Sequence, residues 1–93
     1  EIEHRDSGGV HAMVRPGELN LMTAGAGICH SEVSTKAASV LHGVQLWVAL
    51  PAAARDTDRD FAHYAPTPRV IGSSTLRVFL GELGDSRSPV HTF

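Results

Sequence analysis

The stretch Thr23-Ala24-Gly25-Ala26-Gly27-Ile28-Cys29-His30-Ser31-Glu32 decides how the rest of the chain is interpreted. Its glycines allow a sharp turn, and the residues that follow alternate like a short β-strand over Ile28–Val33. In a strand, residues i and i+2 point to the same face of the sheet. His30 and Glu32 are therefore predicted to share a face, and an imidazole and a carboxylate suit a divalent first-row metal.

The same pair has a second interpretation that involves no metal. His30 could be hydrogen-bonded inside a barrel while Glu32 faces solvent. His42, which precedes Gly43, could reach the same interior as His30 or could lie elsewhere. Spacing alone identifies no further residue that completes a metal site, so both interpretations stay open at this point.

The other chemistry-bearing side chains are interpreted as structural. His4 and Asp6 are an i, i+2 pair beside a turn, where a surface salt bridge or an Asx-type turn is predicted. Cys29 alternates away from His30 and is predicted to be a small buried hydrophobe. Ser31 lacks a Gly-x-Ser-x-Gly frame, which excludes a serine-hydrolase site. Surface positions are predicted for three further histidines: His11, His63 and His91.

Turn residues recur at short intervals and divide the chain into short strands. Arg15-Pro16-Gly17-Glu18 suits a type II turn, with Pro at i+1 and Gly at i+2. Short strands with frequent turns favour an all-β sandwich or barrel. In the first half we predict strands over Ile2–Arg5, Val10–Arg15, Leu19–Thr23 and Ile28–Val33.

Val40–Leu50 is the strongest predicted strand, because its apolar residues alternate. Trp47 within it is predicted to be a core or inter-domain contact. Ser34–Ser39 is interpreted as a loop. The later predictions are a solvated segment over Ala52–Asp60, an extended stretch over Phe61–Pro68, a hairpin joining Val70-Ile71 to Thr75–Leu80, and a connector over Gly81–Ser88.

The composition limits the chain to one small domain and narrows its partners. Its 93 residues carry a net charge of −2, with one Lys and seven Arg scattered along the sequence. The absence of a basic stripe argues against direct nucleic-acid binding. Cys29 is the only cysteine, which excludes an internal disulfide and favours a reducing, cytoplasmic setting. No apolar run of about 18 residues is present, so we expect a soluble protein without membrane association.

Three segments together resemble the pirin family of bicupins. They are Arg15-Pro16-Gly17-Glu18, Met22–Glu32 and His42-Gly43-Val44-Gln45-Leu46-Trp47-Val48-Ala49-Leu50-Pro51. The opening Glu1–Ser7 and the later Leu80-Gly81-Glu82-Leu83 fit the same pattern. The resemblance implies an all-β cupin fold, a double-stranded β-helix or jelly-roll barrel with short antiparallel strands, here incomplete.

By this resemblance, residues 1–83 would form a partial N-terminal barrel, and residues 84–93 would form a connector and the start of a second cupin domain. Both ends of the chain look cut.

The resemblance also implies a metal, typically iron, held by three histidines and one glutamate. His30 and Glu32 match the last two of these ligands. The first two belong to a His-x-His motif that would precede Glu1, and no His-x-His occurs in this sequence. We therefore expect half of an Fe(II) site, or of a site for another divalent metal.

The activity implied by the resemblance is that of a quercetin 2,3-dioxygenase acting on a flavonol-like small molecule. His30 would hold the metal, and Glu32 would be both a ligand and the acceptor of the flavonol hydroxyl proton. Other pirins are regulators that bind protein partners, so a non-enzymatic interaction module is an alternative, as is an inactive fragment. A barrel that lacks strands exposes sheet edges and apolar surface, so we also expect self-association.

Overall fold

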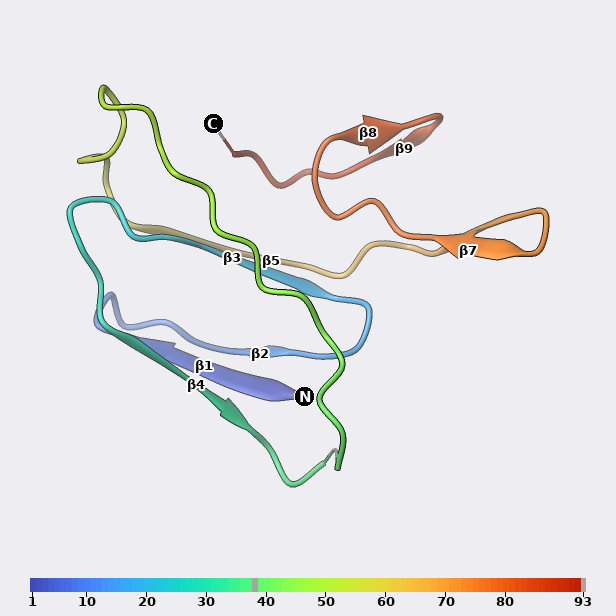
Figure 1. Ribbon diagram of the computed structural model, residues 1–93, viewed down its shortest axis with the longest axis horizontal. Helices are drawn as coiled ribbons and strands as arrows, with labels where there is room; N and C mark the ends of the chain where they lie inside the picture. Colours follow the sequence, from blue (N-terminus) through green and yellow to red (C-terminus); the bar gives the residue numbers. More distant parts are fainter. Residues whose placement is uncertain (38, 93) are drawn as a thin grey trace.

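The computed structural model describes residues 1–37 and 39–92, and these residues form strands and turns but no helix (Figure 1). In chain order the strands are β1 (Ile2–Asp6), β2 (His11–Val14), β3 (Leu19–Thr23), β4 (His30–Ser34), β5 (Asp60–Tyr64), β6 (Arg69–Ile71), β7 (Ser74–Leu76), β8 (Glu82–Leu83) and β9 (Ser86–Arg87). Without a helix, this part of the chain offers no helical segment that could cross a membrane.

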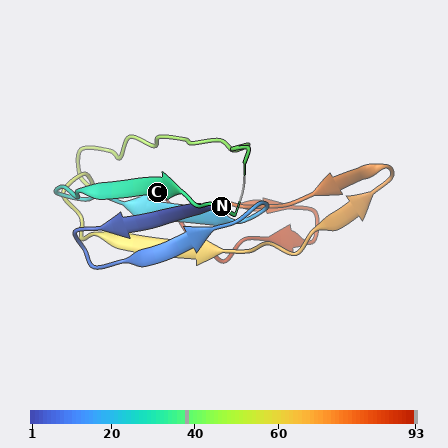
Figure 2. The same ribbon diagram turned by 90° about the horizontal axis from the view of Figure 1, so that it is seen from below.

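All strand pairs are antiparallel, and β1 lies at the centre of the largest sheet. That sheet has the order β2-β1-β4, while β3 pairs with β5, β6 with β7 and β8 with β9. The molecule is flat, with extents of 44 × 36 × 17 Å, and the β6–β7 hairpin projects from one end (Figure 2). The predicted all-β architecture of short antiparallel strands is confirmed.

The predicted turns form as their residues require. The backbone N–H of Glu18 donates to the carbonyl of Arg15 at 3.0 Å, and Gly17 has a φ of 84°, as the third position of a type II turn requires. The turn between β1 and β2 is closed by the N–H of Gly9, which donates to the carbonyl of Asp6 at 3.1 Å.

The strand predicted over residues 40–50 does not form, and that prediction was wrong. The segment follows an irregular path that passes over one side of the strands (Figures 1 and 2). None of the described strands pairs with it, and a strand exists only where a neighbour completes its hydrogen bonds. Trp47, predicted to be a core or inter-domain contact, is 89% exposed, so it is not part of a core in this structure.

Several boundaries also differ from the predictions. β4 begins at His30, two residues later than expected, and β7 ends at Leu76 instead of Leu80. The predicted connector over residues 81–88 contains the short β8–β9 hairpin. Residues 52–59 are turns and coil that are mostly exposed, as predicted, and Asp60 already belongs to β5. Part of the predicted loop over residues 34–39 and the chain's last residue lie outside the described residues, and the predicted division at residues 83 and 84 stays a prediction.

Apolar side chains on β2, β3 and β5 are half-buried, but they form no fully buried core among the described residues. No hydrophobic side chain among them is buried, and the largest fully buried side chain is His4, at 1% exposure. The layers of strands therefore enclose a polar centre, and that centre lies on the sheet that also carries His30 and Glu32.

Candidate metal-ligand site

Two neighbouring strands bring four polar side chains to one face of the β2-β1-β4 sheet. In the antiparallel register, His4 on β1 lies opposite Glu32 on β4, and Asp6 lies opposite His30. Residues directly opposite one another in such a ladder share a face, with Cβ atoms about 4.5–5.5 Å apart. We call the side of the sheet that carries these four residues the ligand face. The prediction that His30 and Glu32 share a face is consistent with this register.

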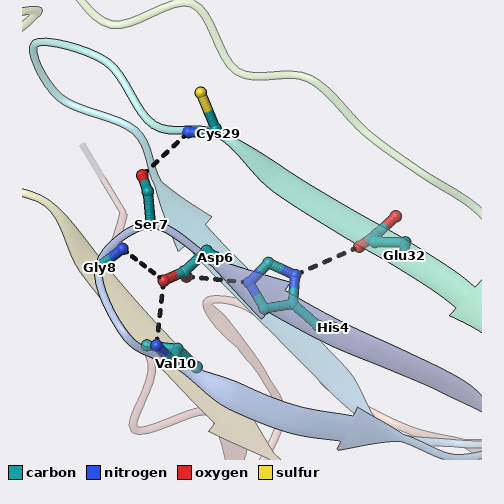
Figure 3. Close-up of polar contacts among 7 residues, drawn as sticks. All are labelled: His4, Asp6, Ser7, Gly8, Val10, Cys29 and Glu32. Atoms are coloured by element: carbon teal, nitrogen blue, oxygen red, sulfur yellow. Dashed lines mark hydrogen bonds and ion pairs between the residues drawn. The ribbon is translucent and has the colours of Figure 1, made fainter.

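His4 and Asp6 form a buried pair instead of the predicted surface salt bridge. His4 Nε2 lies 2.9 Å from Asp6 Oδ2, and the two side chains are only 2% and 1% exposed. The predicted Asx-type turn is present, because Asp6 Oδ1 accepts the backbone N–H of Gly8 at 2.8 Å and of Val10 at 3.0 Å (Figure 3). The pair is buried because Phe61 of β5 covers the His4 ring, with ring centroids 4.8 Å apart.

Glu32 is the accessible member of the ligand face, with its side chain 38% exposed. Its Oε1 lies 3.9 Å from His4 Nδ1, and its Oε2 accepts a hydrogen bond from Gln45 Nε2 at 3.2 Å. His30 stacks on the His4 ring, with centroids 5.6 Å apart and ring planes inclined by 22°. His4 thus contacts both residues that the sequence singles out as metal ligands.

The electrostatics of the β1–β2 hairpin favour ionised carboxylates. The hydrogen bond from His4 lowers the pKa of Asp6 below its ordinary value of 3.8, and the N–H groups of Val10 and Gly8 lower it further, against an opposing effect of burial. Hydrogen bonds from Arg5 and then His11 lower the pKa of Glu3 below its ordinary value of 4.5. Glu3 alternates with His4, so this second cluster lies on the opposite face of the sheet.

The remaining predicted residues lie away from the ligand face. Cys29 is exposed, so the prediction of a small buried hydrophobe was wrong. Cys29 sits just before β4, and its backbone N–H donates to Ser7 Oγ at 3.1 Å (Figure 3). His42 is exposed. His11, His63 and His91 are exposed, as predicted.

As a metal site, this face holds a pair of donors and not a complete set. An imidazole from His30 and a carboxylate from Glu32 are the right donor types for a divalent first-row metal. Within the described residues, however, no group of three or more His, Cys, Asp or Glu side chains is arranged to hold an ion. His4 does not supply a third ligand here, because its Nε2 is directed at Asp6 and its Nδ1 at Glu32. The residues present therefore fit half of a metal site.

Sequence reasoning missed two residues of this site. His4 lies between Glu3 and Arg5, and strand alternation places its side chain on the opposite face of the sheet from theirs. Its position opposite Glu32, however, depends on the β1–β4 register. Gln45 lies in a segment predicted to be a strand, and nothing in its spacing points to Glu32. The alternation in β1 was the one available signal.

The structural comparison defines the class of fold. A quercetin 2,3-dioxygenase from Acinetobacter baumannii, known from its crystal structure, matches 99% of this chain with a TM-score of 0.89 and 38% sequence identity, and 31% of that protein is covered. The chain therefore has the all-β cupin fold, present as part of a barrel.

The sequence comparisons define the family. The family model Pirin matches residues 1–48, which is more than half of the chain, and the chain belongs to the pirin family. A Pseudomonas aeruginosa protein named "Putative quercetin 2,3-dioxygenase" is 39% identical over all of this chain and 30% of its own length. A "Pirin-like protein" of Caulobacter vibrioides is 36% identical, with 35% of its length covered, and "Pirin-1" of Arabidopsis thaliana is 32% identical, with 32% covered. The chain spans about a third of the length of these relatives.

Proposed function

We propose that this chain is the part of an iron-dependent quercetin 2,3-dioxygenase-type pirin that carries two of the metal ligands, His30 and Glu32. The observation that supports the proposal most directly is the ligand face itself. An imidazole and a carboxylate leave the same strand on the same side, next to a buried polar pair. Membership of the pirin family is consistent with a metal cofactor, and the names of two relatives point to a flavonol substrate.

In this proposal the two ligands have different tasks. A bound Fe(II) would supply a Lewis-acid centre with open positions for a flavonol and O2. His30 would hold the metal through a ring nitrogen. Glu32 would bind the metal and also accept the proton of the flavonol hydroxyl, which requires its carboxylate to face the substrate oxygen. The 38% exposure of the Glu32 side chain leaves room for such an approach.

Metal analysis combined with intact mass tests this proposal. The 93-residue chain alone is expected to hold Fe(II) weakly and below one equivalent, because it supplies two donors. A full-length reading frame that contains the chain and adds the His-x-His motif is expected to bind one iron and consume quercetin. In this full-length protein, His30→Ala and Glu32→Gln should each lower the rate of quercetin consumption at least about a hundredfold. Removal of a group that stabilises the transition state typically has an effect of this size.

The matched control is His11→Ala, which removes an exposed histidine on the opposite face of the same sheet and should leave iron content and turnover unchanged. One equivalent of iron on the isolated chain would contradict the half-site. Full turnover in His30→Ala would contradict the assignment of the ligand.

A second candidate function is a regulatory module that binds protein partners. The specific observation in its favour is the exposed apolar segment of residues 40–50, in which Val44, Leu46 and Trp47 are 86%, 81% and 89% exposed. Apolar surface gathered in this way is typical of an interaction site. This function would survive Glu32→Gln, whereas the dioxygenase activity would not, so partner binding by that variant separates the two candidates.

A further inference from the structure

We infer that His4 is a positioning residue, which fixes the directions of His30 and Glu32 before any metal binds. The buried His4–Asp6 pair would thereby serve the proposed metal site, so this role rests on the proposed function. The order of the His30 and Glu32 side chains can nevertheless be measured in the chain without metal.

His4 is itself held in place by its neighbours. Its side chain is 2% exposed, its Nε2 donates to Asp6 Oδ2 at 2.9 Å, and Phe61 lies against its ring at 4.8 Å. Asp6 is anchored in turn, because its other oxygen accepts two backbone N–H groups of the β1–β2 turn. A ring held at one nitrogen and covered on a face has one available orientation.

The fixed His4 ring contacts both proposed ligands. The His30 ring stacks on it at 5.6 Å, and Glu32 Oε1 lies 3.9 Å from its Nδ1. Glu32 Oε2 is held separately by Gln45 at 3.2 Å, so the two carboxylate oxygens have different partners from different parts of the chain. The carboxylate of Glu32 therefore has one hydrogen-bonded oxygen and a second oxygen beside the His4 ring, at a distance longer than a hydrogen bond.

The order that His4 imposes on His30 and Glu32 has a consequence for metal binding. His30 and Glu32 are exposed residues on a short strand, and without a neighbour each would populate several rotamers. A metal would then have to select one combination of rotamers at a cost in affinity. Partners that orient metal ligands from outside the coordination sphere typically change metal affinity by about 10- to 100-fold. His4 occupies that place for both ligands at once.

The test begins with the metal-free chain, in which three-bond couplings and side-chain ¹³C relaxation report the rotamers of His30 and Glu32. Each residue is expected to populate one dominant χ1 rotamer in the wild type. His4→Phe keeps a ring in the buried position but removes both nitrogens, and should leave Glu32 averaged among rotamers. His4→Gln retains a donor for Asp6 and removes the ring, so His30 should lose its order.

The matched control is His11→Phe in the same hairpin. His11 is 56% exposed and pairs with Glu3 on the opposite face, so this change should not alter either ligand. Equal ordering of Glu32 in the wild type and in His4→Phe would overturn the inference. So would rotamer averaging of both ligands in the wild type, a result that needs no variant to fold.

A titration with Co²⁺ alone, carried out on the full-length reading frame that adds the His-x-His motif, then separates this inference from the proposed function. His4→Phe is expected to weaken Co²⁺ binding about 10- to 100-fold relative to the wild type and His11→Phe. If Co²⁺ binds equally well to His4→Phe, the positioning role is rejected and the metal site stands. If the full-length wild type binds no Co²⁺, the proposed function is rejected, while the rotamer measurement on the 93-residue chain still decides the role of His4.

Discussion

The ligand face is held together by polar contacts of individual residues, and Asp6 makes the largest number of them. Its carboxylate accepts hydrogen bonds from His4 and from two backbone N–H groups. A carboxylate with three donors binds its proton less readily when folded than when unfolded, which agrees with the lowered pKa of Asp6. The stability of the β1–β2 hairpin should therefore depend on pH in the acid range.

Asp6 gives the first prediction. Because its folded pKa is depressed, its contribution to stability is complete above its ordinary value of 3.8 and is lost as the pH falls from there through the folded pKa. Asp6→Asn should remove this acid dependence and lower the free energy of unfolding near neutral pH. Urea unfolding at a series of pH values, followed by circular dichroism, measures both effects.

Glu3→Gln provides the comparison for Asp6. The pKa of Glu3 is lowered too, but its partners Arg5 and His11 are 62% and 56% exposed, and solvent screens such pairs. Its effect should be smaller and should fade at high salt. An acid profile that Asp6→Asn leaves unchanged would show that other groups control acid unfolding.

The residues of the site differ in how far the sequence could predict them. The i, i+2 spacing of His30 and Glu32 is a local property of one strand, so it could be predicted. The burial of His4 depends on Phe61, which lies 57 positions further along the chain and reaches His4 only through the β3–β5 pair. Contacts between strands so distant in sequence depend on which strands pair with one another. Alternation within a single strand gives no information about that pairing.

Among the elements, short strands joined by turns were predictable, whereas pairing was not. Leu19–Thr23 became β3 unchanged, because alternation and flanking turn residues mark its ends. Residues 40–50 have an equally strong alternation, yet no described strand lies beside them to accept their hydrogen bonds. β-propensity reports how well a side chain suits a sheet and does not report whether the sheet has a place for it.

The loop between β3 and β4 gives the second prediction. Gly25 has a φ of 53°, and a Cβ added there would collide with the backbone carbonyl oxygen of Thr57. Gly27 in the same loop has a φ of 137°, but a Cβ there would meet no atom within 4 Å. Gly27→Ala should cost only backbone strain, about 1–2 kcal/mol. Gly25→Ala should cost about 1–3 kcal/mol more, because the neighbouring backbone must move.

The measurement is urea unfolding of the two glycine variants beside the wild type. Gly72→Ala is the control for backbone strain, because Gly72 has a φ of 62°, close to that of Gly25, and a Cβ there would meet no atom within 4 Å. If Gly25→Ala costs no more than Gly72→Ala, the loop does not pack against residues 57–58 in solution.

For the molecule as a whole, the exposed apolar surface predicts self-association. Residues 40–50 present Val44, Leu46 and Trp47 to solvent, and apolar area removed from water contributes about 25 cal/mol per Å². The chain should therefore form dimers or larger species as its concentration rises. Because Trp47 is the only tryptophan, its fluorescence should shift toward shorter wavelength in the same concentration range.

Substitutions test which apolar surface is responsible. The double variant Val44→Ser/Leu46→Ser should weaken association roughly tenfold or more, as measured by sedimentation. Val70→Ser/Ile71→Ser is the matched control, since those residues are 77% and 59% exposed on the separate β6–β7 hairpin. Unchanged association in Val44→Ser/Leu46→Ser would place the contact elsewhere than residues 40–50.

A centre made of a histidine–aspartate pair instead of apolar side chains has a calorimetric consequence. The heat capacity of unfolding arises mainly from apolar surface that becomes hydrated, at about 0.45 cal/mol/K per Å². No hydrophobic side chain among the described residues is fully buried, and those on β2, β3 and β5 are half-buried, so unfolding hydrates less apolar surface than in a domain with a closed core. The monomer should therefore have a shallow curve of stability against temperature and a broad melting transition, and its response to urea per residue should be weak.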